Sequence, residues 1–136
     1  MGEDRQPLEC VAVLILKEGT VLAERRKPTK KVVPSAVALP GVHLEPGESI
    51  EDALRRELKE ELGIAPLEVR YVCTLLHRSE EFRKLHYFAV PQWVGKVENH
   101  EAASLRWVPL TAPHDLDLDV DQLALKEYQR LYGGGA

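Results

Sequence analysis

Hydrophobic positions along the chain follow two different periods. Short apolar runs rich in β-branched residues predict strands at residues 8–16, 21–26, 67–77, 85–94 and 104–110. The first two runs flank the turn at residues 17–20 and therefore predict a β-hairpin. Apolar residues recur at helical spacing over residues 50–62 and 120–132. This order predicts an α/β (α+β) fold in which helices cover a mixed β-sheet.

Composition limits the class of protein. No repeat, linker or change of composition divides residues 1–132, which we interpret as one domain, and residues 133–136 (Gly-Gly-Gly-Ala) are predicted to be a frayed tail. The 136 residues are 44% hydrophobic and 29% charged, which excludes a disordered chain. A net charge of −4 argues against a stable complex with nucleic acid. The longest apolar run, residues 10–16, is too short to cross a membrane.

The cysteines point to a reducing compartment. Cys10 and Cys73 lie in apolar stretches and lack the spacing of a metal or redox motif. No charged-then-apolar signal opens the chain. Buried, reduced thiols in a cytoplasmic protein are therefore expected.

The segment 50–62 has the end signals of a helix and an unusual polar face. Ser49 is a natural N-cap and Gly63 a natural C′ residue. At about 100° per residue, one apolar stripe forms on the helix, made of Ile50, Leu54, Leu58 and Leu62. Glu61 falls inside this stripe and Glu57 beside it, where a solvated charge is not expected.

Three glutamates of this helix, Glu57, Glu60 and Glu61, have the spacing that brings side chains together on one side. Carboxylates held so close repel one another unless a cation lies between them. Oxygen ligands without His or Cys suit Mg²⁺ or Mn²⁺. The alternative is an amphipathic helix with ordinary ion pairs, such as Arg56 with Glu60.

Charge is also segregated around this helix. Residues 22–31 carry five bases and one acid, whereas residues 42–64 carry seven acids and three bases. A metal-bound polyphosphate needs such a pairing of acidic and basic groups, so a small molecule of this kind is a candidate partner. Alternatively, the two segments simply neutralise each other.

At these residues the sequence resembles the Nudix hydrolases, whose 23-residue box reads G-x5-E-x7-R-E-U-x-E-E-x-G-U, with U a bulky aliphatic residue. Counted from Val42, every position matches except the first glycine, through Glu48, Arg56-Glu57-Leu58, Glu60-Glu61 and Gly63-Ile64. The resemblance implies the Nudix fold, a mixed sheet between helices. It also implies hydrolysis of a nucleoside diphosphate linked to another moiety.

The resemblance further implies roles for individual residues. Glu57, Glu60 and Glu61 would bind the divalent metal together with the carbonyl oxygen of Gly41. Arg56 would orient a glutamate, and Glu48 would support the loop and the waters around the metal. Glu101, on a later loop, would join the metal site or assist as a base, unless it is only a solvated loop acid. At the first position of the box, Val42 would be strained if the backbone there needs a positive φ.

The substrate is less strongly indicated. Arg26 matches a phosphate-contacting arginine of pyrophosphohydrolases similar to MutT, but it can also be an ordinary hairpin end. Signals of relatives that act on ADP-ribose, diadenosine polyphosphates or NADH are missing at the matching positions, which include Ser79, Glu81 and Phe82. The first choice is therefore a (d)NTP pyrophosphohydrolase, oxidised nucleotides included, that releases a nucleoside monophosphate and pyrophosphate. An ADP-ribose, ADP-sugar or dinucleoside polyphosphate hydrolase is the alternative within the family.

Further interpretations stay open at this point. Asp119 or Asp121 would read the base by the same resemblance, although Asp121 can equally be the N-cap of the last helix. A nucleotide-binding regulatory module with little turnover is the alternative from another class. Homodimerisation through an edge strand is also compatible with the pattern.

Overall fold

The computed structural model describes residues 6–133. Seven strands are present in this range, namely β1 (Leu8–Lys17), β2 (Thr20–Arg25), β3 (Val37–Ala38), β4 (Gly41–His43), β5 (Ala65–Arg78), β6 (Phe82–Val94) and β7 (Ser104–Pro109). The helices are α1 (Ile50–Glu57) with the π-helical turn η1 (Leu58–Leu62), the 3-10 turn η2 (Pro113–Asp115), and α2 (Asp119–Tyr128) with η3 (Gln129–Gly133). Gly133 therefore ends a helical turn, while the rest of the predicted tail, 134–136, lies outside the described residues. None of the helices in the described range has the length and apolar character that a membrane crossing requires.

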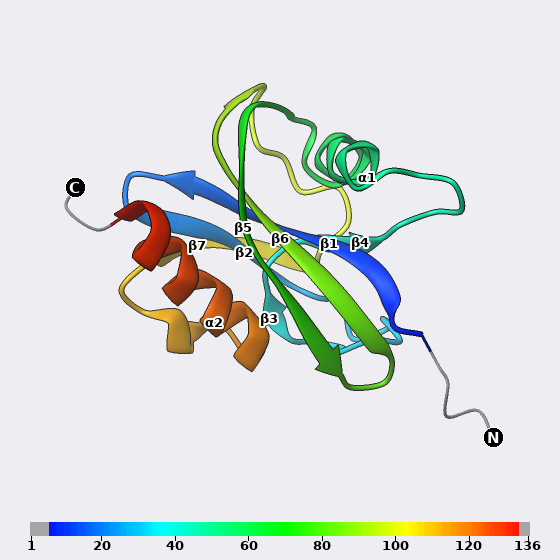
Figure 1. Cartoon of the computed structure of the whole chain (residues 1–136). Coiled ribbons are helices and arrows are strands. Elements are labelled where there is room, and N and C mark those ends of the chain that lie inside the picture. Colours follow the sequence, from blue (N-terminus) through cyan, green and yellow to red (C-terminus); the bar gives the residue numbers. More distant parts are fainter. Residues whose placement is uncertain (1–5, 134–136) are drawn as a thin grey trace.

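The sheet is mixed, as the sequence pattern predicts. Its main order is β3-β2-β1-β6-β5, and β4 pairs with β1 while β7 pairs with β2. The β1–β6 pair is parallel, from Leu8 opposite Arg83 to Ile15 opposite Val90, and the other pairs are antiparallel. Figure 1 shows α1 on one side of the sheet and α2 on the other. The predicted α+β architecture is confirmed.

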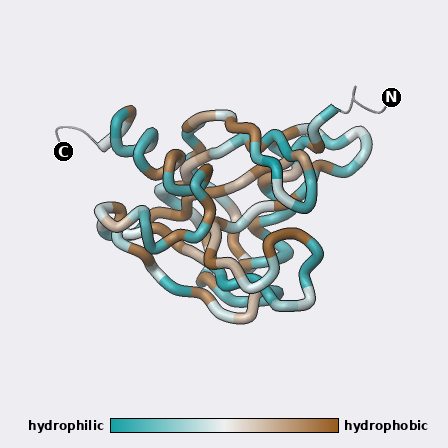
Figure 2. Tube along the Cα trace, turned by 90° about the horizontal axis from the view of Figure 1, so that it is seen from below, coloured by the Kyte–Doolittle hydropathy of each residue, from teal (hydrophilic) through white to brown (hydrophobic). Residues whose placement is uncertain are grey.

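Strand β1 is the centre of both hydrophobic cores because its side chains alternate between the two faces. Its even-numbered residues, such as Ala12 and Leu14, pack in the core that contains Leu125 of α2. Its odd-numbered residues, such as Val13, pack in the core that contains Leu54 of α1. In Figure 2 hydrophilic and hydrophobic residues alternate along the turns of the C-terminal helix, as expected for a helix that buries one side.

Turn chemistry explains two details of the sheet. Glu18 and Gly19 both have positive φ values, 50° and 78°, which a tight hairpin turn between β1 and β2 requires. Proline lacks the backbone N–H that a strand pair needs, so Pro91 is expected in an edge strand or in a bulge. β6 lies between β1 and β5 and is therefore not an edge strand. The register with β5 shifts between Glu68 opposite Gln92 and Arg70 opposite Ala89, which places Pro91 in a bulge.

β5 ends the main order of the sheet and offers an edge for pairing. The Tyr132 hydroxyl donates a hydrogen bond to the carbonyl oxygen of Tyr71 on this strand at 2.6 Å. One backbone acceptor of β5 is therefore already satisfied within the chain. Homodimerisation through an edge strand stays a prediction.

The first box position is accommodated without strain. Val42 pairs with Val11 inside the sheet and is absent from the positive-φ residues, and its side chain packs against the core under α1. The close approach that needs a glycine occurs one residue earlier, because a Cβ on Gly41 would lie 2.7 Å from the Val11 carbonyl oxygen.

We therefore expect Val42→Gly to lower the free energy of unfolding by about 1 to 2 kcal/mol, through lost packing and a more flexible strand. Urea denaturation measures this change. A variant as stable as the parent would show that the Val42 side chain contributes no packing, and a more stable variant would show that position 42 favours a glycine.

Candidate active site

A cavity of about 310 Å³ opens between the sheet, the helices α1 and α2 and the loops that connect the strands. Its lining includes most of the residues that sequence reasoning selected, namely Arg26, Gly41, Glu57, Glu61, Glu101 and Asp121. Four selected residues do not line it, namely Glu48, Arg56, Glu60 and Asp119. The structure therefore separates the candidate residues into a cavity group, an outer group of Glu48, Arg56 and Glu60 at α1, and Asp119 at the start of α2.

Helix α1 begins and ends as the sequence predicts. The Ser49 side chain accepts a hydrogen bond from the Asp52 backbone N–H at 3.0 Å. Gly63 has φ 71°, and its N–H donates to the Lys59 carbonyl while that of Ile64 donates to the Leu58 carbonyl, which is a left-handed (αL) ending. The last five residues, Leu58–Leu62, form a π-helical turn rather than the predicted α-helix.

Glu57 is the most unusual group in the cavity. Its residue is only 2% exposed, and no hydrogen bond or ion pair joins its carboxylate to another described side chain. Burial, together with the nearby carboxylates of Glu61 and Glu24, raises the pKa of Glu57 to about 9. A carboxyl group in this setting stays protonated at neutral pH until a cation compensates its charge.

Glu24 is a cavity residue that sequence reasoning did not select. It ends the buried part of β2, is 7% exposed, and lies 3.5 Å from the guanidinium of Arg26. Burial raises its pKa to about 7, while Arg26 opposes the shift. The sequence did contain a signal for Glu24: it is the one acid among the five bases of residues 22–31, directly after an apolar run.

Two further acids complete this side of the cavity. The pKa of Glu61 is raised by partial burial and by the charge of Glu101. Glu101 forms an ion pair with Lys30 at 3.4 Å. Four basic residues that line the cavity come from one short segment after β2, namely Arg26, Lys27, Lys30 and Lys31, and Arg83 of β6 lines it as well. Acidic and basic groups therefore face one space.

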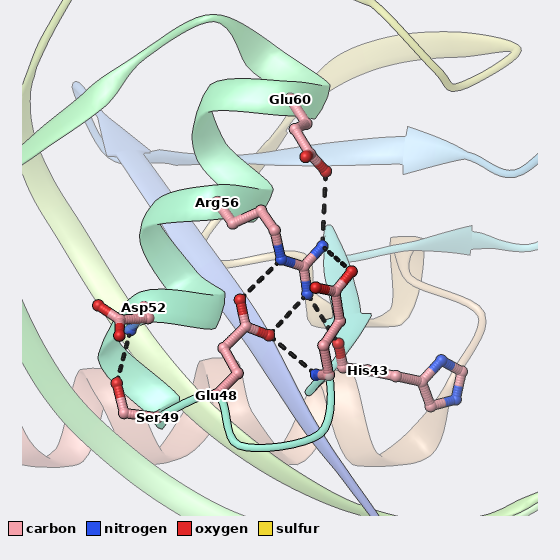
Figure 3. Close-up of polar contacts among 7 residues, drawn as sticks. His43, Glu48, Ser49, Asp52, Arg56 and Glu60 are labelled. Carbon is pink, nitrogen blue, oxygen red and sulfur yellow. Dashed lines mark hydrogen bonds and ion pairs between the residues drawn. The ribbon is translucent and has the colours of Figure 1, made fainter.

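Arg56 organises the outer group (Figure 3). Its Nε and Nη2 donate to the two carboxylate oxygens of Glu48 at 2.7 and 2.9 Å, and Nη2 also donates to the His43 carbonyl at 3.0 Å. Its contact with Glu60 is longer, 3.4 Å. Hydrogen bonds from Arg56 and from the Glu45 backbone lower the pKa of Glu48 to about 2. Arg56 thus fixes the loop before the helix through Glu48 and holds Glu60 more loosely.

Asp121 lies at another wall of the cavity. One carboxylate oxygen accepts from the Tyr87 hydroxyl at 2.6 Å and the other from the Leu39 backbone N–H at 3.0 Å. Burial raises its pKa to about 6 although both hydrogen bonds oppose the shift. The N-cap of α2 is Leu118, so the alternative that Asp121 caps the helix is wrong.

The residues present fit a hard divalent cation by donor type and by charge. The charges of Glu61 and Glu24 raise the pKa of Glu57, and the charge of Glu61 also raises the pKa of Glu24, which shows a local excess of negative charge on oxygen donors. Within residues 6–133, however, no three acidic, His or Cys side chains stand ready as a metal-binding group.

Comparisons with known proteins agree with this geometry. The family described as the NUDIX domain matches residues 7–129. The chain belongs to the Nudix family. A CTP pyrophosphohydrolase of Escherichia coli (strain K12) is 35% identical to this Nudix hydrolase over 103 residues, 74% of either chain. An 8-oxo-dGTP diphosphatase of Buchnera aphidicola subsp. Schizaphis graminum is 26% identical over 98 residues, 72% of this chain and 73% of the relative. The solution structure of the E. coli ORF135 protein has a TM-score of 0.80 at 28% identity, over 98% of this chain and 96% of the other.

The high pKa of Glu57 gives a stability test for this Nudix hydrolase without metal. The ordinary pKa is 4.5 and the folded value about 9, so the folded state binds more protons than the unfolded state between these values. Stability should therefore fall as pH rises from about 5 to about 9. Glu57→Gln should remove the part of this loss that Glu57 causes and raise the free energy of unfolding at pH 8 by about 1 to 3 kcal/mol, while Glu24, whose pKa is raised to about 7, keeps its own smaller part.

Urea denaturation in a chelating buffer at pH 5 and pH 8 measures both effects. The matched control is Glu51→Gln, which alters an exposed glutamate of the same helix that pairs with Arg55 at 3.1 Å. An equal pH dependence in the Glu57→Gln variant and the parent would contradict this electrostatic account.

Proposed function

We propose that this Nudix hydrolase is a nucleoside triphosphate pyrophosphohydrolase that uses Mg²⁺ or Mn²⁺ and releases a nucleoside monophosphate and pyrophosphate. The observation that carries the proposal is the charge arrangement in one cavity. Buried carboxylates, Glu57 foremost, line it together with four bases from residues 26–31. A polyphosphate bound through a divalent cation needs both kinds of group. The relatives named as a CTP pyrophosphohydrolase and an 8-oxo-dGTP diphosphatase support the same class of substrate.

Glu57 and Glu61, with Glu60, Glu101 and the Gly41 carbonyl, would hold the cation. When bound, the cation neutralises the diphosphate and makes a water molecule a stronger nucleophile at neutral pH. A cavity glutamate would accept the proton of the attacking water.

The remaining residues bind and orient. Arg26, whose Nε donates to the Val32 carbonyl at 3.0 Å, presents a fixed guanidinium to a phosphate group. Lys30 would exchange its ion pair with Glu101 for a contact with phosphate. Asp121, held by Tyr87 and Leu39, would offer its oxygens to donors of the base, with Asp119 nearby as the second candidate.

The compartment is part of this proposal. Cys10 and Cys73 are both free, which suits a reducing cytoplasm.

The test is pyrophosphate release from a panel of (d)NTPs, with 8-oxo-dGTP, ADP-ribose and diadenosine polyphosphates added, in Mg²⁺ and in Mn²⁺. We expect one or more triphosphates to be hydrolysed, with no turnover in a chelator. Glu57→Gln should lower kcat by about 10²- to 10⁴-fold because it removes a charged cavity group. Glu60→Gln should also lower kcat, since Glu60 joins the cation in the active state.

The exposed helix variant Glu51→Gln should retain its activity within about twofold, since surface pairs contribute little. Hydrolysis of ADP-ribose alone would overturn the substrate choice and keep the hydrolase. Nucleotide binding without turnover in either metal would favour the regulatory module.

A further inference from the structure

The loop between β6 and β7 closes the end of the helix that carries Glu57. The last carbonyl groups of a helix have no partner within it. Here the Glu98 N–H donates to the Leu62 carbonyl at 2.9 Å and the His100 N–H donates to the Glu61 carbonyl at 3.0 Å. The His100 ring binds the Glu60 carbonyl through Nδ1 at 3.0 Å. Residues of one loop thus satisfy the three final carbonyls of η1.

His100 is the centre of this contact. Its Nε2 also lies 2.9 Å from the Glu98 carboxylate, so the ring is held from two sides. Gly63 makes room for it, because a Cβ at that position would lie 3.2 Å from His100 Cε1. The imidazole therefore fits a site that the helix ending and the loop build together.

The next residue along the loop is Glu101, which lines the cavity. Its carboxylate pairs with Lys30 at 3.4 Å and raises the pKa of Glu61. Asn99 holds the turn, since its Oδ1 accepts from the Ala102 N–H at 2.9 Å. The position of Glu101 relative to the helix thus depends on where His100 is bound.

We propose that His100 is a positioning residue that fixes Glu101 in the active site by binding the loop to the carbonyl of Glu60. This inference rests on the proposed pyrophosphohydrolase function. His100 does not contact the reacting atoms itself. His100 affects the rate through the position of Glu101. A displacement of a reacting group by about 1 Å can lower a rate about 100-fold.

The experiment compares steady-state kinetics of His100 variants on the best triphosphate of the panel. His100→Ala should lower kcat by about 10- to 100-fold and change KM by less than about threefold. His100→Asn keeps an N–H donor near the place of Nδ1 and should recover most of the rate. His100→Gln keeps a donor near the place of Nε2, reaches Glu98 rather than the helix, and should stay slow.

A double-mutant cycle tests the route through Glu101. When Glu101 is already replaced by Gln, adding His100→Ala should lower kcat by less than about another threefold, because the group that His100 positions is gone. The matched control is His114→Ala, which alters an exposed histidine of η2. Assays are run below the unfolding temperature of each variant. If His100→Ala does not fold, the comparison of His100→Asn with His100→Gln still tests the proposal.

Equal rates for the Asn and Gln variants, an effect confined to KM, or multiplicative losses in the cycle would each overturn the proposal. These outcomes are all read in a protein whose parent hydrolyses a triphosphate. If the parent protein hydrolyses no triphosphate, the proposed function is refuted. That result differs from a failure of this inference, in which the parent is active but the His100 variants do not behave as expected.

Discussion

A buried carboxylate without a countercharge is the constraint around which this molecule is organised. Glu57 is placed in the core side of α1, where burial raises its pKa to about 9. Keeping an ionised carboxylate there costs several kcal/mol unless a cation or hydrogen bonds compensate it. Without a cation the carboxyl stays protonated at neutral pH, and the cavity leaves it within reach of a cation. Under the proposed function the same group has to be ionised, so stability and activity place opposite demands on one side chain.

The rest of the fold holds this group in place. Alternate side chains of β1 pack in the two hydrophobic cores, so α1 and α2 are held on opposite faces of the same strand. At one end of α1, Arg56 binds Glu48 and the His43 carbonyl and fixes the preceding loop. At the other end, the loop with His100 satisfies the final carbonyls. Rigid attachment at both ends lets a short helix hold a charge in an unfavourable place.

Much of this could be predicted from the sequence because the signals are local. The hairpin, the Ser49 cap and the Gly63 ending each depend on a few adjacent residues, and the structure confirms them. Features set by contacts distant in the chain were not predictable: the burial of Glu24 depends on β2 facing α1, and the bonds of Asp121 depend on Tyr87 and Leu39. The π-helical turn also arises from packing that no local pattern encodes. The contact of Glu60 with Arg56, by contrast, is the i,i+4 ion pair that the helical spacing offers as an alternative to a metal ligand.

The most direct test of the central claim is proton release when the metal binds. Titration calorimetry with Mg²⁺ or Mn²⁺ at pH 7.5, in two buffers of different ionisation enthalpy, counts the protons exchanged. A carboxyl with a pKa of about 9 must lose its proton to become a ligand. We predict that about one proton is released per binding event and that Glu57→Gln abolishes the release. Metal binding with no proton release, or with equal release in the variant, would contradict the account.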